Sequence, residues 1–148
     1  MLQCGIDEAG RGALAGPVCA AAVILQDTFD VSILDDSKKL SPKKREKARD
    51  AILKYALFCH ISYATHEQID EINILQATLV AMKDAFEHLF AQYSVSDHRD
   101  RLSVIVDGNR LPRIYGDFDL RAEPGADGRY PCVMAASILA KTDRDRCM

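Results

Sequence analysis

Short apolar runs of strand length, separated by longer stretches of helical spacing, constrain the fold of this chain most strongly. The runs have the composition and alternation typical of β-strands, and they cover residues 2–6, 18–25, 57–64, 102–106 and 118–121. Helical spacing of apolar residues is found at 42–55, 73–93 and 131–145. Strands dominate the first part of this order, and strands mixed with helices follow. This order predicts an α/β domain built around a single sheet.

The clearest helix is predicted from Asn73 to about Tyr93. One apolar stripe defines it, formed by Leu75, Leu79, Met82, Phe86, Leu89 and Tyr93. Such a stripe is typical of a helix packed on a core rather than of a partner surface. A second helix is predicted to begin at Ser41-Pro42, because serine caps helix starts and proline suits the first turn.

The length and composition indicate one soluble domain that spans residues 1–148. Apolar residues make up 48% of the chain and charged residues 28%, and no apolar run approaches the roughly 20 residues of a membrane helix. The N-terminus lacks a signal sequence, so we expect a cytoplasmic protein without membrane contact. The five cysteines form no CxxC pair, which argues against a disulfide framework or a structural zinc site and favours buried thiols.

The distribution of charge is more informative than the net charge of −3. From Lys38 to Arg49 the chain carries many lysines and arginines and a single acid, Glu46. This run is compatible with a solvated helix face. It is also compatible with a surface that contacts phosphates, where cations gain affinity by releasing counterions from nucleic acid.

Two of the apolar runs end in acids. Asp7-Glu8 follows the first strand and Asp107 follows the run at 102–106. If these strands are parallel neighbours, their carboxyl ends meet and the acids need a cation between them. Mg²⁺ or Mn²⁺ suits carboxylate oxygens better than zinc does. Each acid also has an ordinary interpretation, since Asp107-Gly108 is a common turn dipeptide and Asp127 could form a turn or cap the last helix.

The string GIDEAGRG at residues 5–12 favours the metal-binding interpretation of these acids over the ordinary one. It resembles the opening motif of type 2 ribonucleases H, the bacterial ribonuclease HII group. Further matches follow in the family's order, and they are DSKKL at 36–40, INI at 72–74, VDG at 106–108, AASILAK at 135–141 and Arg144-Asp145. The resemblance extends from Gly5 to Met148.

The resemblance implies a ribonuclease H-like fold, a mixed central sheet flanked by helices. It also implies a catalytic, metal-binding set of four acids, which are Asp7, Glu8, Asp107 and Asp127. Asp127 is chosen because it lies ten residues before Ser137; Asp145 is its rival. The implied reaction is endonucleolytic cleavage with two Mn²⁺ or Mg²⁺ ions, which leaves 5′-phosphate and 3′-hydroxyl ends.

The family also implies the partners and the residues that bind them. The expected substrates are RNA–DNA hybrids and DNA duplexes that contain ribonucleotides, cut by a monomer. The turn Gly10-Arg11-Gly12 would read the ribose 2′-hydroxyl, the group that distinguishes RNA from DNA. Ser37 and Lys38 match phosphate contacts of the family, and so does Asn73.

The sequence departs from the family pattern in two places. Gly125 stands where the family usually has a lysine, two residues before the fourth acid. The family pattern also continues past the position of Met148 with a tyrosine that packs on the sugar, so we expect a chain that is short at its C-terminus. Two alternatives to the active nuclease stay open: a truncated relative that binds hybrids or metal without cutting, and a fragment completed in trans.

Overall fold

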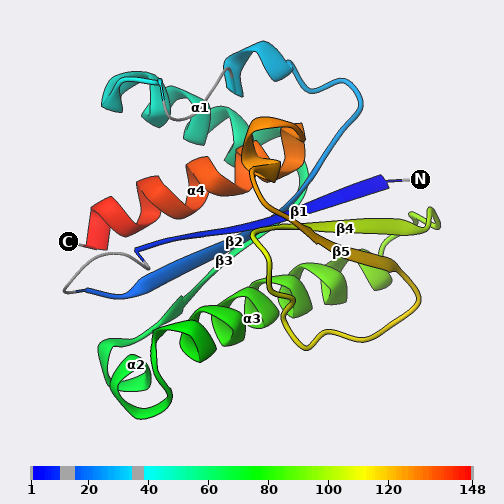
Figure 1. Ribbon diagram of the computed structural model, residues 1–148. Helices are drawn as coiled ribbons and strands as arrows, with labels where there is room; N and C mark the ends of the chain where they lie inside the picture. The colour runs from blue at the N-terminus through cyan, green and yellow to red at the C-terminus, as the bar shows by residue number, and fades with distance from the viewer. Residues whose placement is uncertain (1, 11–15, 35–38, 148) are drawn as a thin grey trace.

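The structure is a computed structural model that describes residues 2–10, 16–34 and 39–147. A five-stranded sheet forms its centre, with the strand order β3-β2-β1-β4-β5 (Figure 1). The strands are β1 (Leu2–Ala9), β2 (Val18–Leu25), β3 (Ala56–Ala64), β4 (Leu102–Asp107) and β5 (Asp119–Glu123). The helices are η1 (Val31–Leu34), α1 (Pro42–Tyr55), α2 (His66–Ile72), α3 (Ile74–Ser94), η2 (Ala126–Gly128) and α4 (Pro131–Cys147).

The strands pair in both senses. β1 pairs antiparallel with β2, which pairs antiparallel with β3, whereas β1, β4 and β5 run parallel to one another. The prediction of a mixed sheet flanked by helices is therefore confirmed, and the two acid-bearing strands are parallel neighbours, which is the condition under which their acids meet.

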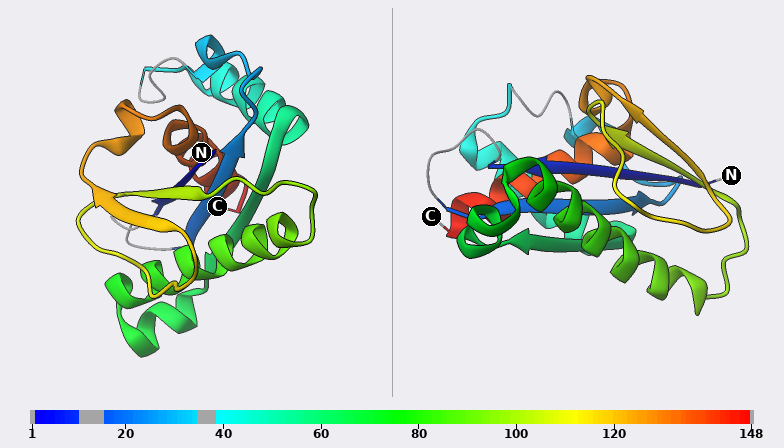
Figure 2. Two further views of the ribbon diagram at one scale, coloured as in Figure 1. Left: turned by 90° about the vertical axis from the view of Figure 1, so that its right-hand side faces the viewer. Right: turned by 60° about the horizontal axis from the view of Figure 1, so that its bottom comes forward.

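Helices cover both faces of the sheet (Figures 1 and 2). The long helix α3 lies on one face, where Met82, Phe86 and Leu89 pack on Ile6 and Val104. Helices α1 and α4 lie on the other face, where α4 contacts β1 and β2. The core is thus two apolar layers separated by the sheet, a consequence of strands that are apolar on both sides.

Several boundaries differ from the prediction. β1 continues through Asp7 and Glu8, so the acids belong to the strand instead of following it. The last strand begins at Asp119 rather than Phe118 and runs on to Glu123. Strand β3 lies at an edge of the sheet, and most of its side chains are partly buried, whereas Tyr63 near its end is 40% exposed.

The helix starts follow local chemistry. Ser41 caps α1 by accepting a hydrogen bond from the backbone N–H of Lys44, as predicted. The prediction missed α2, which begins with a capping box between Thr65 and Gln68. In the described part of the chain, no helix combines the length and the apolar character that crossing a membrane requires.

Candidate active site

Asp7 lies near the end of β1 and is 5% exposed. Its neighbour Ile6 packs in the core on the α3 face. Because successive side chains of a strand point to opposite faces, Asp7 points to the face that α4 covers. The backbone N–H of Glu8 donates a hydrogen bond of 2.8 Å to Asp7 Oδ1, which fixes the orientation of this carboxylate.

Asp107 is the last residue of β4, the parallel neighbour of β1. The pairing of Ile6 with Val106 places Asp7 and Asp107 side by side on the sheet. Two backbone N–H groups donate to Asp107 Oδ1, that of Gly125 at 3.1 Å and that of Ala126 at 3.2 Å. The segment after β5 therefore holds the acid at the end of β4.

That segment also delivers the third acid. Gly125 has φ +77°, a left-handed conformation that favours glycine, and the turn it makes leads into η2. Asp127 is in the middle of η2. Glycine rather than lysine at position 125 suits this tight turn because of its positive φ, and the backbone N–H of the same residue binds Asp107.

The three acids converge. One carboxylate oxygen from each of Asp7, Asp107 and Asp127 lies within 4.8 Å of the other two. Burial raises the pKa of Asp7 well above its ordinary value, and the Asp107 charge raises it further. Burial also raises the pKa of Asp107, and the Asp127 charge adds to this effect.

This donor set fits a divalent cation. Oxygen ligands from carboxylates are those that Mg²⁺ and Mn²⁺ prefer, and a cation would relieve the repulsion that raises these pKa values. The arrangement can therefore hold a metal ion at the carboxyl ends of β1 and β4, as the sequence predicted for Asp7 and Asp107.

The other two candidate acids do not join this group. Glu8 follows Asp7 along β1, and strand alternation directs its side chain toward the opposite face of the sheet. Asp145 is exposed on α4. The structure thus brings together three of the four predicted acids, and at the contested fourth position it favours Asp127 over Asp145.

Gly10, the first residue of the predicted substrate-reading turn, lies against Arg144 of α4. It has φ +98°, and a Cβ atom there would overlap Arg144 Nε. Arg144 Nε also donates a hydrogen bond of 3.0 Å to the Pro17 carbonyl. Sequence reasoning noted Arg144 only as part of a family motif and missed these contacts. Arg11, Gly12, Ser37 and Lys38 lie outside the described residues.

Asn73 joins α2 to α3 with φ 72° and caps α3. Its side-chain oxygen accepts a hydrogen bond of 3.0 Å from the backbone N–H of Gln76. A phosphate contact by Asn73 would therefore use its side-chain NH₂ group, which is the donor end of the amide.

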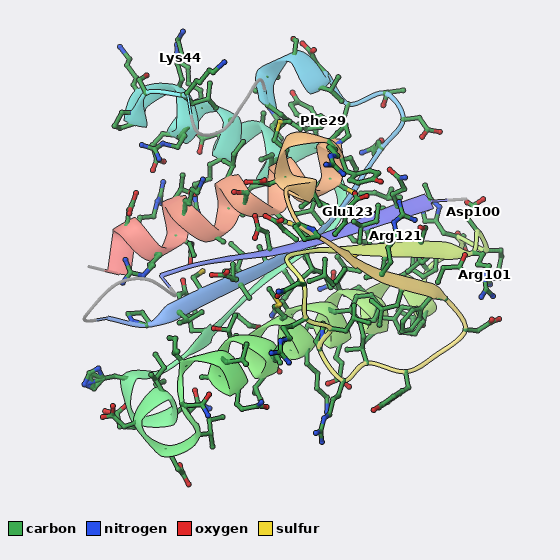
Figure 3. The ribbon with its side chains drawn as sticks, viewed as in Figure 1. Phe29, Lys44, Asp100, Arg101, Arg121 and Glu123 are labelled. Atoms are coloured by element: carbon green, nitrogen blue, oxygen red, sulfur yellow. The ribbon has the colours of Figure 1, made fainter. Side chains whose placement is uncertain are left out.

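The basic run on α1 divides into two parts. Lys43 and Lys44 are exposed, and Lys44 points away from the body of the protein (Figure 3). Arg49 is buried instead, and it donates to Thr142 Oγ1 at 2.9 Å and to Asp143 Oδ1 at 2.7 Å. Arg49 therefore fastens α1 to α4, whereas the lysines remain available to a charged partner.

Comparison with known proteins identifies relatives along almost the whole chain. The family model described as Ribonuclease HII matches residues 4–148. A ribonuclease HII from Treponema denticola is 52% identical over 155 residues, which is 99% of this chain and 77% of that protein. The chain spans 58 to 77% of the length of the curated relatives it matches.

Solved structures agree with this. The ribonuclease HII of the complex with PCNA from Archaeoglobus fulgidus superposes with a TM-score of 0.74 and 28% identity, over 99% of this chain and 74% of that one. Bst-RNase HIII in complex with Mn²⁺ superposes with a TM-score of 0.84 over 100% of this chain and 53% of that one. At 18% identity, the second likeness concerns the fold alone, a ribonuclease H-like fold.

Proposed function

The chain belongs to the ribonuclease HII family, whose members are metal-dependent endoribonucleases, and we propose that it hydrolyses the RNA strand of RNA–DNA hybrids. The observation that carries this proposal is the convergence of Asp7, Asp107 and Asp127 within 4.8 Å at the ends of two parallel strands. A cluster of carboxylates with raised pKa values is costly to fold and is typical of sites that bind divalent metals.

The proposal extends to the details of the reaction. The enzyme would cut hybrids and also DNA at embedded ribonucleotides, with two Mn²⁺ or Mg²⁺ ions, and would leave 5′-phosphate and 3′-hydroxyl ends. When bound, the ions would activate the attacking water and stabilise the leaving 3′ oxygen. Asp7, Asp107 and Asp127 would hold them, with Glu8 as the fourth acid. We also propose that the enzyme acts as a monomer in the cytoplasm.

The chain's own groups prepare this site before any substrate arrives. The N–H of Glu8 orients Asp7, and the N–H groups of Gly125 and Ala126 orient Asp107. Carboxylates held in this way need little rearrangement during the reaction, which lowers its barrier.

Selection of RNA would come from the turn at Gly10, Arg11 and Gly12, whose main chain can approach a sugar closely and read its 2′-hydroxyl. Support comes from Gly10, whose φ of +98° suits glycine and where a Cβ atom would overlap Arg144. Ser37, Lys38 and Asn73 would bind phosphates and fix the register of the duplex.

The test is a labelled DNA duplex with one embedded ribonucleotide, and a matching all-DNA duplex, incubated with Mg²⁺ or Mn²⁺. We expect the protein to cut only the first duplex and to leave the phosphate on the 5′ end of the downstream product. Asp7→Asn should abolish cutting, whereas Asp117→Asn, a 95% exposed acid at the far end of the sheet, should not.

Three other outcomes would change the proposal. Retention of the duplex without cutting would indicate a binding protein, and cutting only after addition of a C-terminal segment would indicate a fragment that acts in trans. Cutting that survives in Asp7→Asn would disprove the assigned metal centre.

A further inference from the structure

A groove lies between α3 and the segment that follows β4. It has a volume of about 560 Å³ and is lined by one face of α3 and by residues 109–113. Figures 1 and 2 show that segment, in yellow-green and yellow, running beside α3. We name this feature the α3 groove.

The charged residues of the α3 groove are all cations. Lys83 comes from α3, and Arg110 and Arg113 come from the segment after β4; no carboxylate is among its eight described lining residues. Three other cavities of the described part of the chain each include at least one aspartate. The groove is therefore suited to an anion, although the whole chain has a net charge of −3.

Both sides of the α3 groove adjoin residues of the proposed active site. Asn109 lines one side and is two residues from Asp107, so their Cα atoms are at most about 7 Å apart. Gln76 lines the other side, and its N–H is bonded to Asn73. Short segments of chain therefore connect both sides of the groove to residues of the proposed site.

Apolar side chains complete the lining. Val80 is 46% exposed and Leu111 44% exposed, and Leu79 is partly buried against the core. Cations and amides beside exposed apolar carbons match the sugar-phosphate backbone of a nucleic acid, whose phosphates are anionic and whose sugars present C–H groups.

We propose that the α3 groove binds the phosphate backbone of the duplex on one side of the cut, through Lys83, Arg110 and Arg113. The binding would carry no sequence information but would fix how the duplex lies across the acids. This inference rests on the proposed function, because it assigns the groove to the same substrate.

The experiment compares the wild type with a triple variant, Lys83→Gln, Arg110→Gln and Arg113→Gln. Binding of labelled duplexes with one ribonucleotide is measured by fluorescence anisotropy without added metal, over a range of salt concentrations. One duplex extends on both sides of the ribonucleotide, and two others are shortened on one side or the other. The negative slope of the logarithm of the binding constant against the logarithm of the salt concentration should become shallower by about 0.9 for each phosphate that the variant no longer neutralises. For all three phosphates the change is roughly 2.7.

The control is Arg99→Gln, which removes an exposed cation on the loop before β4, at the opposite end of that strand from Asp107. We expect the triple variant to bind the full duplex more weakly than the control does. On the duplex that is shortened on the side that reaches the groove, the two variants should bind with equal affinity. Equal binding by the triple variant and the control on every duplex would overturn the inference, and so would an equal reduction of affinity on all three.

The two proposals can fail separately. If the wild type binds the duplexes but cuts none, the proposed nuclease activity is disproved. The anisotropy comparison still decides the role of the groove. If the wild type cuts and the triple variant binds like the control, only the groove assignment is wrong. Failure of the wild type to bind any duplex would overturn both.

Discussion

The two ends of β4 lie beside aspartates in opposite surroundings. At its start, Arg101 bonds to Asp117 and, at 3.1 Å, to Asp119 (Figure 3 labels Arg101). At its end, Asp107 faces Asp7 and Asp127. The first arrangement neutralises its acids with a cation of the chain, and the second places acids together.

The difference appears in the pKa values. Hydrogen bonds with Asp119 and Asp117 raise the pKa of Arg101, so these two aspartates favour the charged state of the guanidinium. Burial raises the pKa values of Asp7 and Asp107, and the charge of Asp107 raises that of Asp7 further while the charge of Asp127 raises that of Asp107, so this site disfavours the charged state of its acids. At the start of the strand the acids thus have a cation of the chain itself, whereas at its end they fit an external cation.

The largest effect should come from removing an acid at each end in turn. Asp107→Asn should lower kcat by roughly 10²–10³-fold or more, the scale of losing one preorganised electrostatic group. Asp117→Asn should leave the rate unchanged. Initial rates on the ribonucleotide duplex test this, and an equal decrease in both variants would remove the distinction between the two ends.

Metal should stabilise the protein through the acids at the end of β4 and not through those beside its start. At a Mn²⁺ concentration about 100 times its Kd, binding adds about 2.7 kcal/mol to the free energy of unfolding. We expect thermal denaturation to show this increase in the wild type and in Asp119→Asn but not in Asp107→Asn. An increase of the same size in Asp107→Asn would place the ion elsewhere.

The pH dependence of stability should also separate the ends. Because the folded pKa of Asp7 is raised, the native state binds more protons than the unfolded state between the ordinary value near 4 and the raised value. Stability of the metal-free protein therefore falls as pH rises through this window. Asp7→Asn should be more stable than the wild type at neutral pH, and this advantage should shrink as the pH approaches 4 in urea denaturation series. If the stability difference between Asp7→Asn and the wild type stayed constant over this pH range, it would not come from ionisation of Asp7.

The smallest effect should come from Arg101→Gln. Its side chain is 46% exposed, and exposed ion pairs contribute little to stability. We expect a melting temperature and a cleavage rate that match the wild type within error. A marked decrease of either would mean that the start of β4 is more than a solvated surface.

Sequence reasoning predicted the elements that have strong periodicity. The strand Val18–Leu25 and the long helix beside Asn73 were found with nearly their observed bounds. It missed α2, because a seven-residue helix shows too few turns for an apolar stripe, although its capping box is readable. The family motifs supplied Asp127, which spacing alone would have left as a turn residue.

The rest of the site depends on contacts between distant segments. Strand alternation could have shown that Glu8 and Asp7 face opposite sides, once β1 was known to extend past Ile6. The α3 groove could not be foreseen, since it needs Lys83 to lie across from Arg110 and Arg113. The same holds for the backbone of Gly125, whose bond to Asp107 depends on the pairing of β4 with β5.

Arg144 gives the loop between β1 and β2 a dependence on the far end of the chain. The same side chain lies against Gly10 and bonds to Pro17, so both borders of that loop rest on the final turns of α4. Fraying of these turns would release the borders of the loop while Asp7 and Asp107, held by backbone N–H groups elsewhere, stayed in place. If the turn at Gly10 reads the sugar as proposed, loss of sugar discrimination should therefore precede loss of metal binding when the helix end is weakened.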